Sequence, residues 1–524
     1  ESRFGLESSF MSNETRKIII LGGGTAGWMT AAACAKFLPE DYQIVLVESE
    51  QIGTVGVGEA TIPHIRYFNN MLGIDEREFL SEVKATYKLG IQFIDWGSLG
   101  SAYIHPFGSH GHSVGGIDFH HFWLSAMASG EALAFDQFSL AVTMAEKKRF
   151  AFPETSVANG KNTFTYAYHI DAGRYAQFLR KYAEERNVVR IEGRLSSAIM
   201  DTASGALSSL HLDSGAIVAG DFFIDCSGFR ALLLADQLSV PFDDWSNWLL
   251  CDRAVAVPCE RVEPPKPYTI AHAKAWGWQW RIPLQHRTGN GMVYSSSAIT
   301  DQDALQNLLI SLDGSPLAEP NFLKFTAGRR KKSWEKNCIA IGLSSGFLEP
   351  LESTSIYLIQ QGILKFLECF PGSGDLPTLR DAYNQEMEAE YLRIRDFLIL
   401  HYKITKRNDS EFWRYCQNMV LPESLERSIE LFRAAGRVAR YQNGLFMSPS
   451  WLAVYLGQGI DQVGFDARTL NYPAAIVLDE MKKMRAKLES QVQLMSMAND
   501  VLESELSSSG ICEHPVAASL YGVV

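Results

Sequence analysis

A glycine-rich turn between a buried-type strand and a helix constrains this chain more than any other feature. The apolar run Lys17–Leu21 leads directly into Gly22, Gly24 and Gly27, spaced as G-x-G-x-x-G, and a helix-forming stretch follows over residues 28–38. A continuous apolar run suits a strand that is buried on both faces of a parallel sheet. The three glycines permit a tight turn, the close approach of a pyrophosphate and close helix–strand packing.

A second apolar strand follows the helix and ends in an acid. Residues 44–47 are closed by Glu48, which lies 21 residues after Gly27. An acid at this place accepts hydrogen bonds from ribose hydroxyls, and the pyrophosphate sits at the helix N-terminus. We therefore predict a dinucleotide site that contains Gly22, Gly24, Thr25, Ala26, Gly27 and Glu48. The spacing alone does not separate FAD from NAD.

Later segments complete the expected architecture. Two short apolar runs, residues 222–228 and 338–342, end in small-residue turns and are expected to return to the nucleotide sheet, which is more typical of FAD enzymes. Residues 75–100 look helical, and residues 108–116 look like a loop that covers a site. Residues 375–445 and 472–508 have helical spacing of Leu, Glu, Arg, Ala and Met.

These patterns predict an α/β protein with a Rossmann-type, flavin monooxygenase-like FAD core, an inserted substrate-side sheet and a helical C-terminal region. The expected domains are an FAD-binding core with interleaved substrate segments over 16–370, a mainly helical region over 371–510 and a tail over 511–524. Residues 1–10 precede Met11 and are interpreted as a cloning remnant.

Composition narrows the functional classes. The chain of 524 residues has 48 Lys+Arg and 60 Asp+Glu, a formal net charge of −12, which disfavours nucleic acid and anionic membrane surfaces as partners. We find no apolar stretch of transmembrane length and expect no secretory signal. The eight cysteines form no CxxC pair, so a cytoplasmic protein without a disulfide scaffold is expected.

Three further motifs carry a family resemblance. They are Gly56–Pro63 (GVGEATIP), Trp278–Pro283 (WQWRIP) and Glu349–Thr354 (EPLEST). Together with the glycine-rich turn they resemble the flavin-dependent halogenases, typified by the tryptophan halogenases. The WxWxIP hexapeptide is the most specific of the three, and the resemblance runs from about residue 16 to about residue 510.

The resemblance implies a two-component enzyme. A separate flavin reductase supplies reduced FAD, O2 adds to give a flavin C4a-hydroperoxide, and chloride or bromide attacks it to give hypohalous acid. The acid passes through a tunnel to a lysine beside an electron-rich aromatic substrate. That substrate is expected to be indole-like and undergoes electrophilic substitution. A second copy of the chain is a candidate partner, as in a homodimer.

The resemblance also assigns site residues. Lys88 matches the lysine that polarises hypohalous acid or forms a haloamine, and burial should lower its pKa. Glu352 matches the second catalytic residue, and Ser353 would orient it. The backbone N–H groups of Thr354 and Ser355 match the halide-binding turn.

The remaining matched residues surround the flavin and the substrate. Trp278 and Trp280 would form a wall that keeps substrate away from the oxidant, although two Trp at i and i+2 also suit the core of a sheet. His105 and Phe107 match rings that sandwich the substrate. Residues 53–63, which include Gly58 and Ile62, match a strap over the flavin.

This chain departs from the tryptophan halogenases at two places. The segment Leu445–Leu456, which includes the expected substrate residue Trp451, lacks their paired tyrosines, so free tryptophan is a doubtful substrate and a larger or less polar indole, a phenol or a peptide remains open. Ser355 stands where those enzymes commonly carry Gly, which would alter the halide pocket without fixing the preference between chloride and bromide.

Four histidines, His110, His112, His120 and His121, suggest a metal site, but no nearby Cys, Asp or Glu set completes a ligand shell, and we predict no metal. Two other functions remain as alternatives: a flavin-dependent aromatic monooxygenase that hydroxylates, and a non-catalytic flavin-binding protein. Neither has a need for both Lys88 and Glu352.

Overall fold

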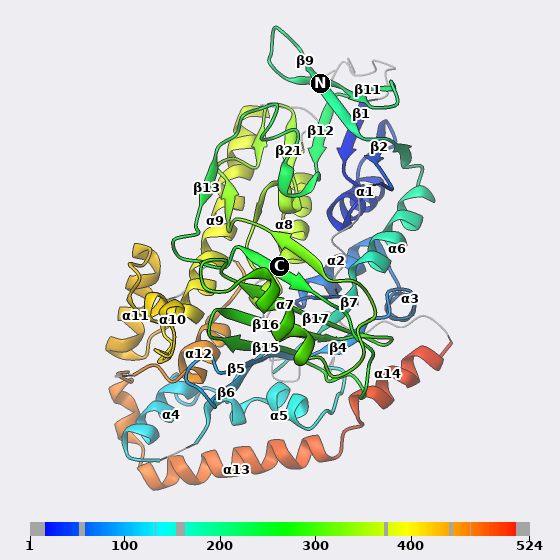
Figure 1. Cartoon of the computed structure of the whole chain (residues 1–524). Coiled ribbons are helices and arrows are strands. Elements are labelled where there is room, and N and C mark those ends of the chain that lie inside the picture. Colours follow the sequence, from blue (N-terminus) through cyan, green and yellow to red (C-terminus); the bar gives the residue numbers. More distant parts are fainter. Residues whose placement is uncertain are drawn as a thin grey trace, which may run out of the picture.

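The structure, a computed structural model, describes residues 16–51, 58–131, 133–153, 163–370, 376–439, 444–461 and 463–509. A six-stranded sheet, at the top of Figure 1, forms the nucleotide end of the molecule. Its strand order is β20 (Trp334–Glu335), β21 (Cys338–Ala340), β12 (Phe222–Asp225), β1 (Arg16–Leu21), β2 (Tyr42–Glu48) and β8 (Val189–Glu192). The two late runs therefore return to this sheet as β12 and β21, as expected.

Strand β1 is apolar because it is buried on both faces. It pairs in parallel with β12 and with β2. Ile18 and Ile20 pack in the main core with helix α1, whereas Ile19 and Leu21 pack in a second core with the small sheet on the other face. Helix α1 (Thr25–Phe37) contacts β1 and β2 and packs against α6 (Ala172–Glu184) and α8 (Ser355–Cys369). The small sheet contains β9 (Leu195–Met200), β10 (Leu207–Leu212) and β11 (Ile217–Ala219).

A seven-stranded sheet lies in the lower half of the molecule (Figure 1). Its order is β18 (Asn321–Lys324), β14 (Arg253–Ala256), β17 (Thr288–Tyr294), β16 (Gly277–Pro283), β15 (Thr269–Lys274), β5 (Gly90–Ile94) and β6 (Ala102–Pro106). Helix α7 (Asp301–Ile310) contacts β14 and β17.

The expected helix over residues 75–100 is wrong beyond its first turns. Only α3 (Glu76–Glu82) is helical, and the chain then forms β4 (Thr86–Lys88) and β5. Strand β5 gains partners that are distant in sequence, since it pairs in parallel with β15 as well as with the adjacent β6. This tertiary pairing overrides the local helical preference.

A small sheet connects the two halves and positions the site. Its central strand, β7 (Ala167–Asp171), pairs antiparallel with β3 (Gly58–Ala60) on one side and with β4 on the other. The sheet thus holds the GVGEATIP segment and Lys88 on either side of one strand. Another three-stranded sheet contains β13 (Phe242–Asp244), β19 (Gly328–Arg330) and β22 (Gly346–Phe347).

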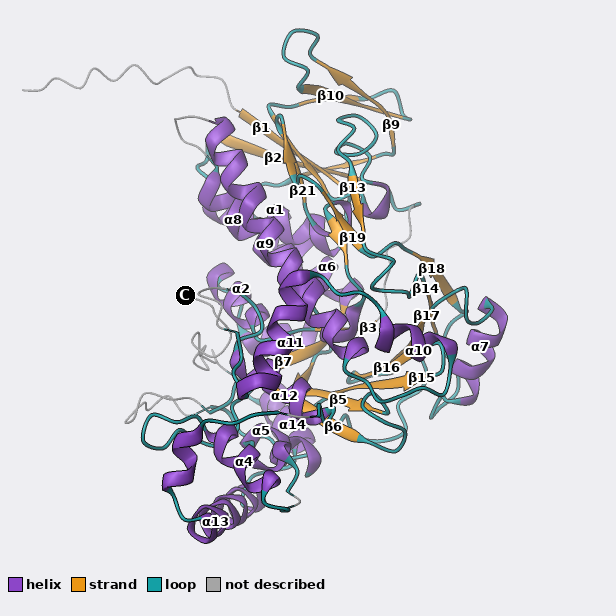
Figure 2. Cartoon of the chain, turned by 90° about the vertical axis from the view of Figure 1, so that its left-hand side faces the viewer, coloured by secondary structure: helices purple, strands orange, loops and turns teal. Residues whose placement is uncertain are grey.

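Helices dominate the last third of the described chain, as predicted. They are α9 (Leu376–Lys403), α10 (Glu411–Asn418), α11 (Glu423–Ala435), α12 (Ser448–Gly457), α13 (Ala474–Gln493) and α14 (Ala498–Ser507). Three α-helices not yet introduced lie earlier in the chain: α2 (His64–Leu72), α4 (Phe119–Ala128) and α5 (Leu140–Glu146). Figure 2 shows α9 beside α8, which in turn contacts α1. None of the helices in the described ranges combines the length and the apolar character needed to cross a membrane.

Candidate active site

The glycine-rich turn is built for a close approach of backbone and ligand. Gly22 has φ +116°, and a Cβ there would lie 2.2 Å from the Cys226 carbonyl oxygen. A Cβ on Gly27 would lie 1.8 Å from the Gly22 carbonyl oxygen, whereas one on Gly24 would meet no atom within 4 Å. Gly24 is also the N-cap residue of α1. Because glycine has no side chain to accept hydrogen bonds from the first N–H groups of the helix, these donors are left for an anion.

Glu48 lies beside this turn. A Cβ on Gly23 would fall 1.4 Å from Glu48 Oε2, so the carboxylate lies directly over the glycines. Its other oxygen, Oε1, accepts a hydrogen bond from Arg190 Nε at 2.6 Å, which holds the side chain in place. An anion site at α1 and an acid beside it fit the pyrophosphate and a ribose of a dinucleotide such as FAD. Thr25 and Ala26 form the first turn of α1.

Lys88 is fully buried at the end of β4. Its Nζ donates hydrogen bonds to the Thr61 carbonyl oxygen and to Ser353 Oγ, each at 2.9 Å, and lies 5.1 Å from the centroid of the Phe107 ring. Burial lowers the pKa of Lys88 to about 7, and the negative charge of Glu352 opposes part of that shift. The expected burial and lowered pKa are thus present, and the ammonium does not face bulk water.

Glu352 is the centre of a buried network. Its carboxylate contacts His105 Nδ1 at 2.9 Å and His401 Nε2 at 2.8 Å. Burial alone would raise the pKa of this carboxyl, but His105 and His401 lower it to about 2. Glu352 therefore stays ionised within a dry site.

Two residues of the site, His401 and Phe397, were not predicted from the sequence. His401 lies in α9, 49 residues after Glu352, with no motif around it. Phe397, one turn earlier, stacks on Phe446 with ring centroids 4.0 Å apart and contacts Trp451 at 5.2 Å. The only sequence signal is their i, i+4 spacing on one helix, which equally fits an ordinary core position.

The EPLEST segment ends at the N-terminus of a long helix. Ser353 adopts a left-handed conformation with φ 59°, and α8 begins at Ser355 with Thr354 as its N-cap. Within the described chain, the N–H groups of Thr354 and Ser355 donate to no backbone carbonyl outside α8. Two adjacent N–H groups at the start of a helix suit a small anion.

The two tryptophans of WQWRIP are core residues of β16. Trp278 and Trp280 point to the same side, with ring centroids 6.2 Å apart, and Trp278 also contacts Trp96. Gly291 on the neighbouring strand makes room for Trp280, because a Cβ there would lie 2.1 Å from the indole. The Trp280 indole N–H has no hydrogen-bond partner among the described residues.

Other expected residues are accounted for as follows. Gly58 and Ile62 are buried around the β3 strand, whereas residues 53–57 of the expected strap lie outside the described residues. His105 binds Glu352 through Nδ1, so only its other edge is available for a substrate. The four histidines line one cavity, but no group of three or more His, Cys, Asp or Glu side chains within the described ranges could hold a metal ion.

Comparisons with known proteins agree with this geometry. The sequence model of the tryptophan halogenase family matches residues 17–469. Tryptophan 6-halogenase ThaL of Streptomyces albogriseolus is 37% identical over 448 residues, which cover 81% of this chain and 83% of that protein. The tryptophan 7-halogenase RebH of Lentzea aerocolonigenes is 35% identical over 442 residues, covering 81% and 83%.

Solved structures match even more of the chain. A flavin-dependent halogenase from Xanthomonas campestris superposes with a TM-score of 0.90 at 45% identity, covering 95% of this chain and 99% of that one. BrvH, a flavin-dependent halogenase from Brevundimonas sp. BAL3, gives 0.89 at 43% identity, covering 94% and 99%. Because the family model matches residues 17–469 and relatives of 35–37% identity cover 81% of the chain, this chain belongs to the tryptophan halogenase family and is a flavin-dependent halogenase.

Proposed function

We propose that this enzyme chlorinates or brominates an electron-rich aromatic ring of the indole type, with Lys88 and Glu352 as its catalytic residues. The observation that carries the proposal is the link between the two. Lys88 Nζ donates to Ser353 Oγ, on the direct neighbour of Glu352, and all three side chains are buried. A lysine and a carboxylate held together in this way have no role in merely binding a flavin.

The chain's own groups divide the work. Reduced FAD, when bound, supplies with O2 the oxidising power that converts halide to hypohalous acid. Lys88 Nζ then holds that acid by a hydrogen bond at a fixed place beside the ring, or, as the neutral amine, takes its halogen to form a haloamine as the O–X bond breaks and water leaves. Glu352, kept ionised by two histidines, stabilises the cationic ring and accepts the proton that leaves it.

The surroundings support the remaining assignments. The paired N–H groups of Thr354 and Ser355 would bind the halide, and Trp278 and Trp280 would separate the substrate from the flavin. A separate reductase would supply reduced FAD, in the cytoplasm, where the seven described cysteines would stay free thiols as in this structure. We also propose that the chain divides into a core over 16–370 and a helical region over 371–510. We propose further that it forms a homodimer.

An aromatic cluster next to Glu352 favours a flat substrate. The His105 ring centroid lies 5.8 Å from that of Phe397 and 6.2 Å from that of Phe446, and Trp451 packs on Phe397. Phe107 lies under Lys88. Rings of this kind stack on an indole or phenol and contribute about 0.5–1.5 kcal/mol beyond burial.

The test is a panel of indoles, phenols and tryptophan incubated with the enzyme, FAD, a flavin reductase, NADH and either bromide or chloride. Mass spectrometry should show halogenated products whose mass follows the halide. Lys88→Ala should abolish them while FAD still binds. Hydroxylated product without halogen would support a monooxygenase instead, and full activity in Lys88→Ala would refute the assigned mechanism.

A further inference from the structure

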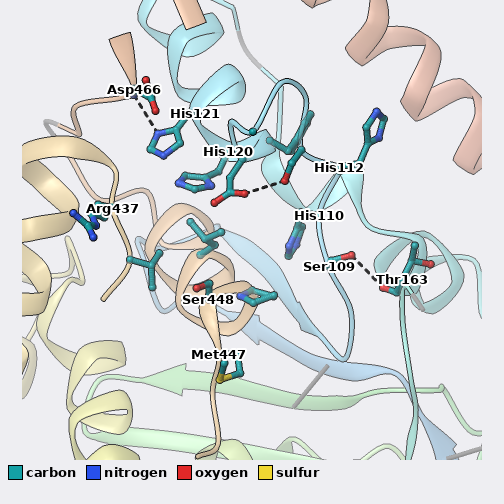
Figure 3. Close-up of a pocket in the computed structure, with 18 of the residues that line it drawn as sticks. Ser109, His110, His112, His120, His121, Thr163, Arg437, Met447, Ser448 and Asp466 are labelled. Atoms are coloured by element: carbon teal, nitrogen blue, oxygen red, sulfur yellow. Dashed lines mark hydrogen bonds between the residues drawn. The ribbon is translucent and has the colours of Figure 1, made fainter. Parts of the chain in front are cut away.

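A cavity of about 850 Å³ lies near this aromatic cluster, between the loop after β6 and the start of α12 (Figure 3). Ser109 and His110 line one wall, shortly after Phe107 in sequence, and Met447 and Ser448 line another, directly after Phe446. The volume is at the upper end of the range for small-molecule sites. It exceeds what a bare indole needs, so the cavity has room for a part of the substrate that does not react.

His110 gives this cavity an unsatisfied polar wall. The side chain is only 8% exposed, and neither ring nitrogen has a hydrogen-bond partner among the described residues. Its ring stacks on Phe135 with centroids 4.4 Å apart, which fixes its orientation. Burial, followed by the nearby His105, lowers the pKa of His110 to about 3, so the ring is neutral and offers one donor and one acceptor.

Among the described residues that line the cavity, Arg437 is a cation without a carboxylate partner. Asp466 pairs with Arg468 at 2.6 Å, and Asp118 accepts a hydrogen bond from Ser113 Oγ at 2.9 Å. Arg437, by contrast, has no carboxylate within 4.0 Å in the described part of the chain. Figure 3 shows Arg437 and His110 on opposite sides of the cavity, with Ser448 between them in this view.

The segment that carries Arg437 is held tightly. Gly436 ends α11 in a left-handed conformation with φ 63°, and its carbonyl accepts a hydrogen bond from His120 Nε2 at 2.8 Å. A Cβ on Gly436 would lie 2.7 Å from the Gly464 carbonyl oxygen, so the two loops pack backbone to backbone. His121 Nδ1 accepts the Asp466 N–H at 3.2 Å and fixes the second loop. The histidines that suggested a metal thus support the cavity wall.

We propose that this cavity is an outer subsite for the tail of the substrate, and that the tail is a carboxylate joined to the aromatic ring by a flexible spacer. Arg437 pairs with the carboxylate, and His110 hydrogen-bonds to a polar group on the tail. The inference rests on the proposed aromatic halogenation and adds the chemical class of the substrate to it.

The experiment compares indole-3-alkanoic acids, with tails of two to six carbons, with their primary amides of equal length. In the wild type, the best acid should exceed its amide in kcat/KM by up to roughly 5-fold, because an exposed ion pair contributes up to about that factor. The ratio should fall as salt is added. In Arg437→Gln the acid-to-amide ratio should approach one.

Two further variants separate the subsite from general damage. Arg433→Gln removes an exposed arginine of α11 that does not line the cavity, and it should keep the wild-type ratio. His110→Phe preserves a ring on Phe135 and should weaken acid and amide alike. Equal kcat/KM for every acid and amide pair, or a ratio that survives Arg437→Gln, overturns the proposal.

Binding keeps the inference separate from the proposed function. Calorimetric titration of the same acid and amide pairs measures the subsite without turnover. If no indole is halogenated but the acids still bind more tightly than their amides in an Arg437-dependent way, the proposed reaction fails and the subsite stands. If indole is halogenated and calorimetry shows no preference for the acids, only the subsite fails.

Discussion

His401 lies between two oxygen acceptors. Its Nε2 is 2.8 Å from Glu352 Oε1, and its Nδ1 is 2.8 Å from the carbonyl oxygen of Phe397 one turn earlier in α9. The ring thereby bridges Glu352 and the backbone of α9. Burial raises the pKa of the Glu352 carboxyl, but its contacts with His105 and then His401 lower that pKa to about 2.

We predict that His401→Phe impairs catalysis through Glu352. Loss of the His401 contact raises the pKa of the Glu352 carboxyl from about 2, so the acid limb of the kcat/KM profile should move to higher pH. Losing one hydrogen bond to a buried charge should reduce activity by roughly 10- to 100-fold near that limb. His401→Gln, which keeps an N–H donor, should recover part of the loss. An unchanged pH profile in His401→Phe would contradict this role.

Whether a feature could be predicted from the sequence depends on how far apart in the chain its interacting residues lie. The turn at Gly22–Gly27 was predictable because strand, turn and helix are consecutive, and the geometry at Gly22 and Gly27 leaves no space for a Cβ. The strand β5 was not, because its pairing with β15 joins residues far apart in the chain.

The candidate site shows the same division. Lys88 and Glu352 were assigned through a resemblance, and no local pattern around Lys88 distinguishes it from other lysines. His401 reaches Glu352 only because α9 packs against the core. Phe446 likewise reaches His105 only through tertiary packing. Such contacts arise from tertiary packing, which one sequence without homologues does not reveal.

We predict that the cost of burying Lys88 depends on pH. Its folded pKa of about 7 lies below the ordinary value of 10.5, so the unfolded chain binds more protons between these two values. The destabilisation is therefore greatest below pH 7 and disappears as pH rises toward 10.5. Lys88→Met should increase the free energy of unfolding relative to wild type by more at pH 6 than at pH 9.

Urea unfolding of both proteins at the two pH values measures this difference. The two hydrogen bonds that Lys88 makes are lost in the variant at either pH, so they largely cancel in the comparison. Lys88→Arg serves as the matched control, because it keeps a buried cation that does not titrate in this range. A gap between Lys88→Met and wild type that is the same at pH 6 and pH 9 would show that Lys88 keeps its ordinary pKa.

Two glycines of the nucleotide turn should respond differently to alanine. A Cβ on Gly24 meets no protein atom within 4 Å, and the residue has φ −74°, so Gly24→Ala should fold normally. The added methyl group would nevertheless occupy the space at the N-terminus of α1 where a pyrophosphate approaches. Gly27→Ala places a methyl 1.8 Å from the Gly22 carbonyl oxygen and forces the helix away from the strand, which costs about 1–3 kcal/mol of stability.

We expect Gly24→Ala to keep the wild-type melting temperature and to lose FAD affinity by about 10-fold or more. Gly27→Ala should lose both thermal stability and FAD affinity. Thermal unfolding without FAD and quenching of flavin fluorescence measure the two effects, and wild-type FAD affinity in Gly24→Ala would place the pyrophosphate elsewhere.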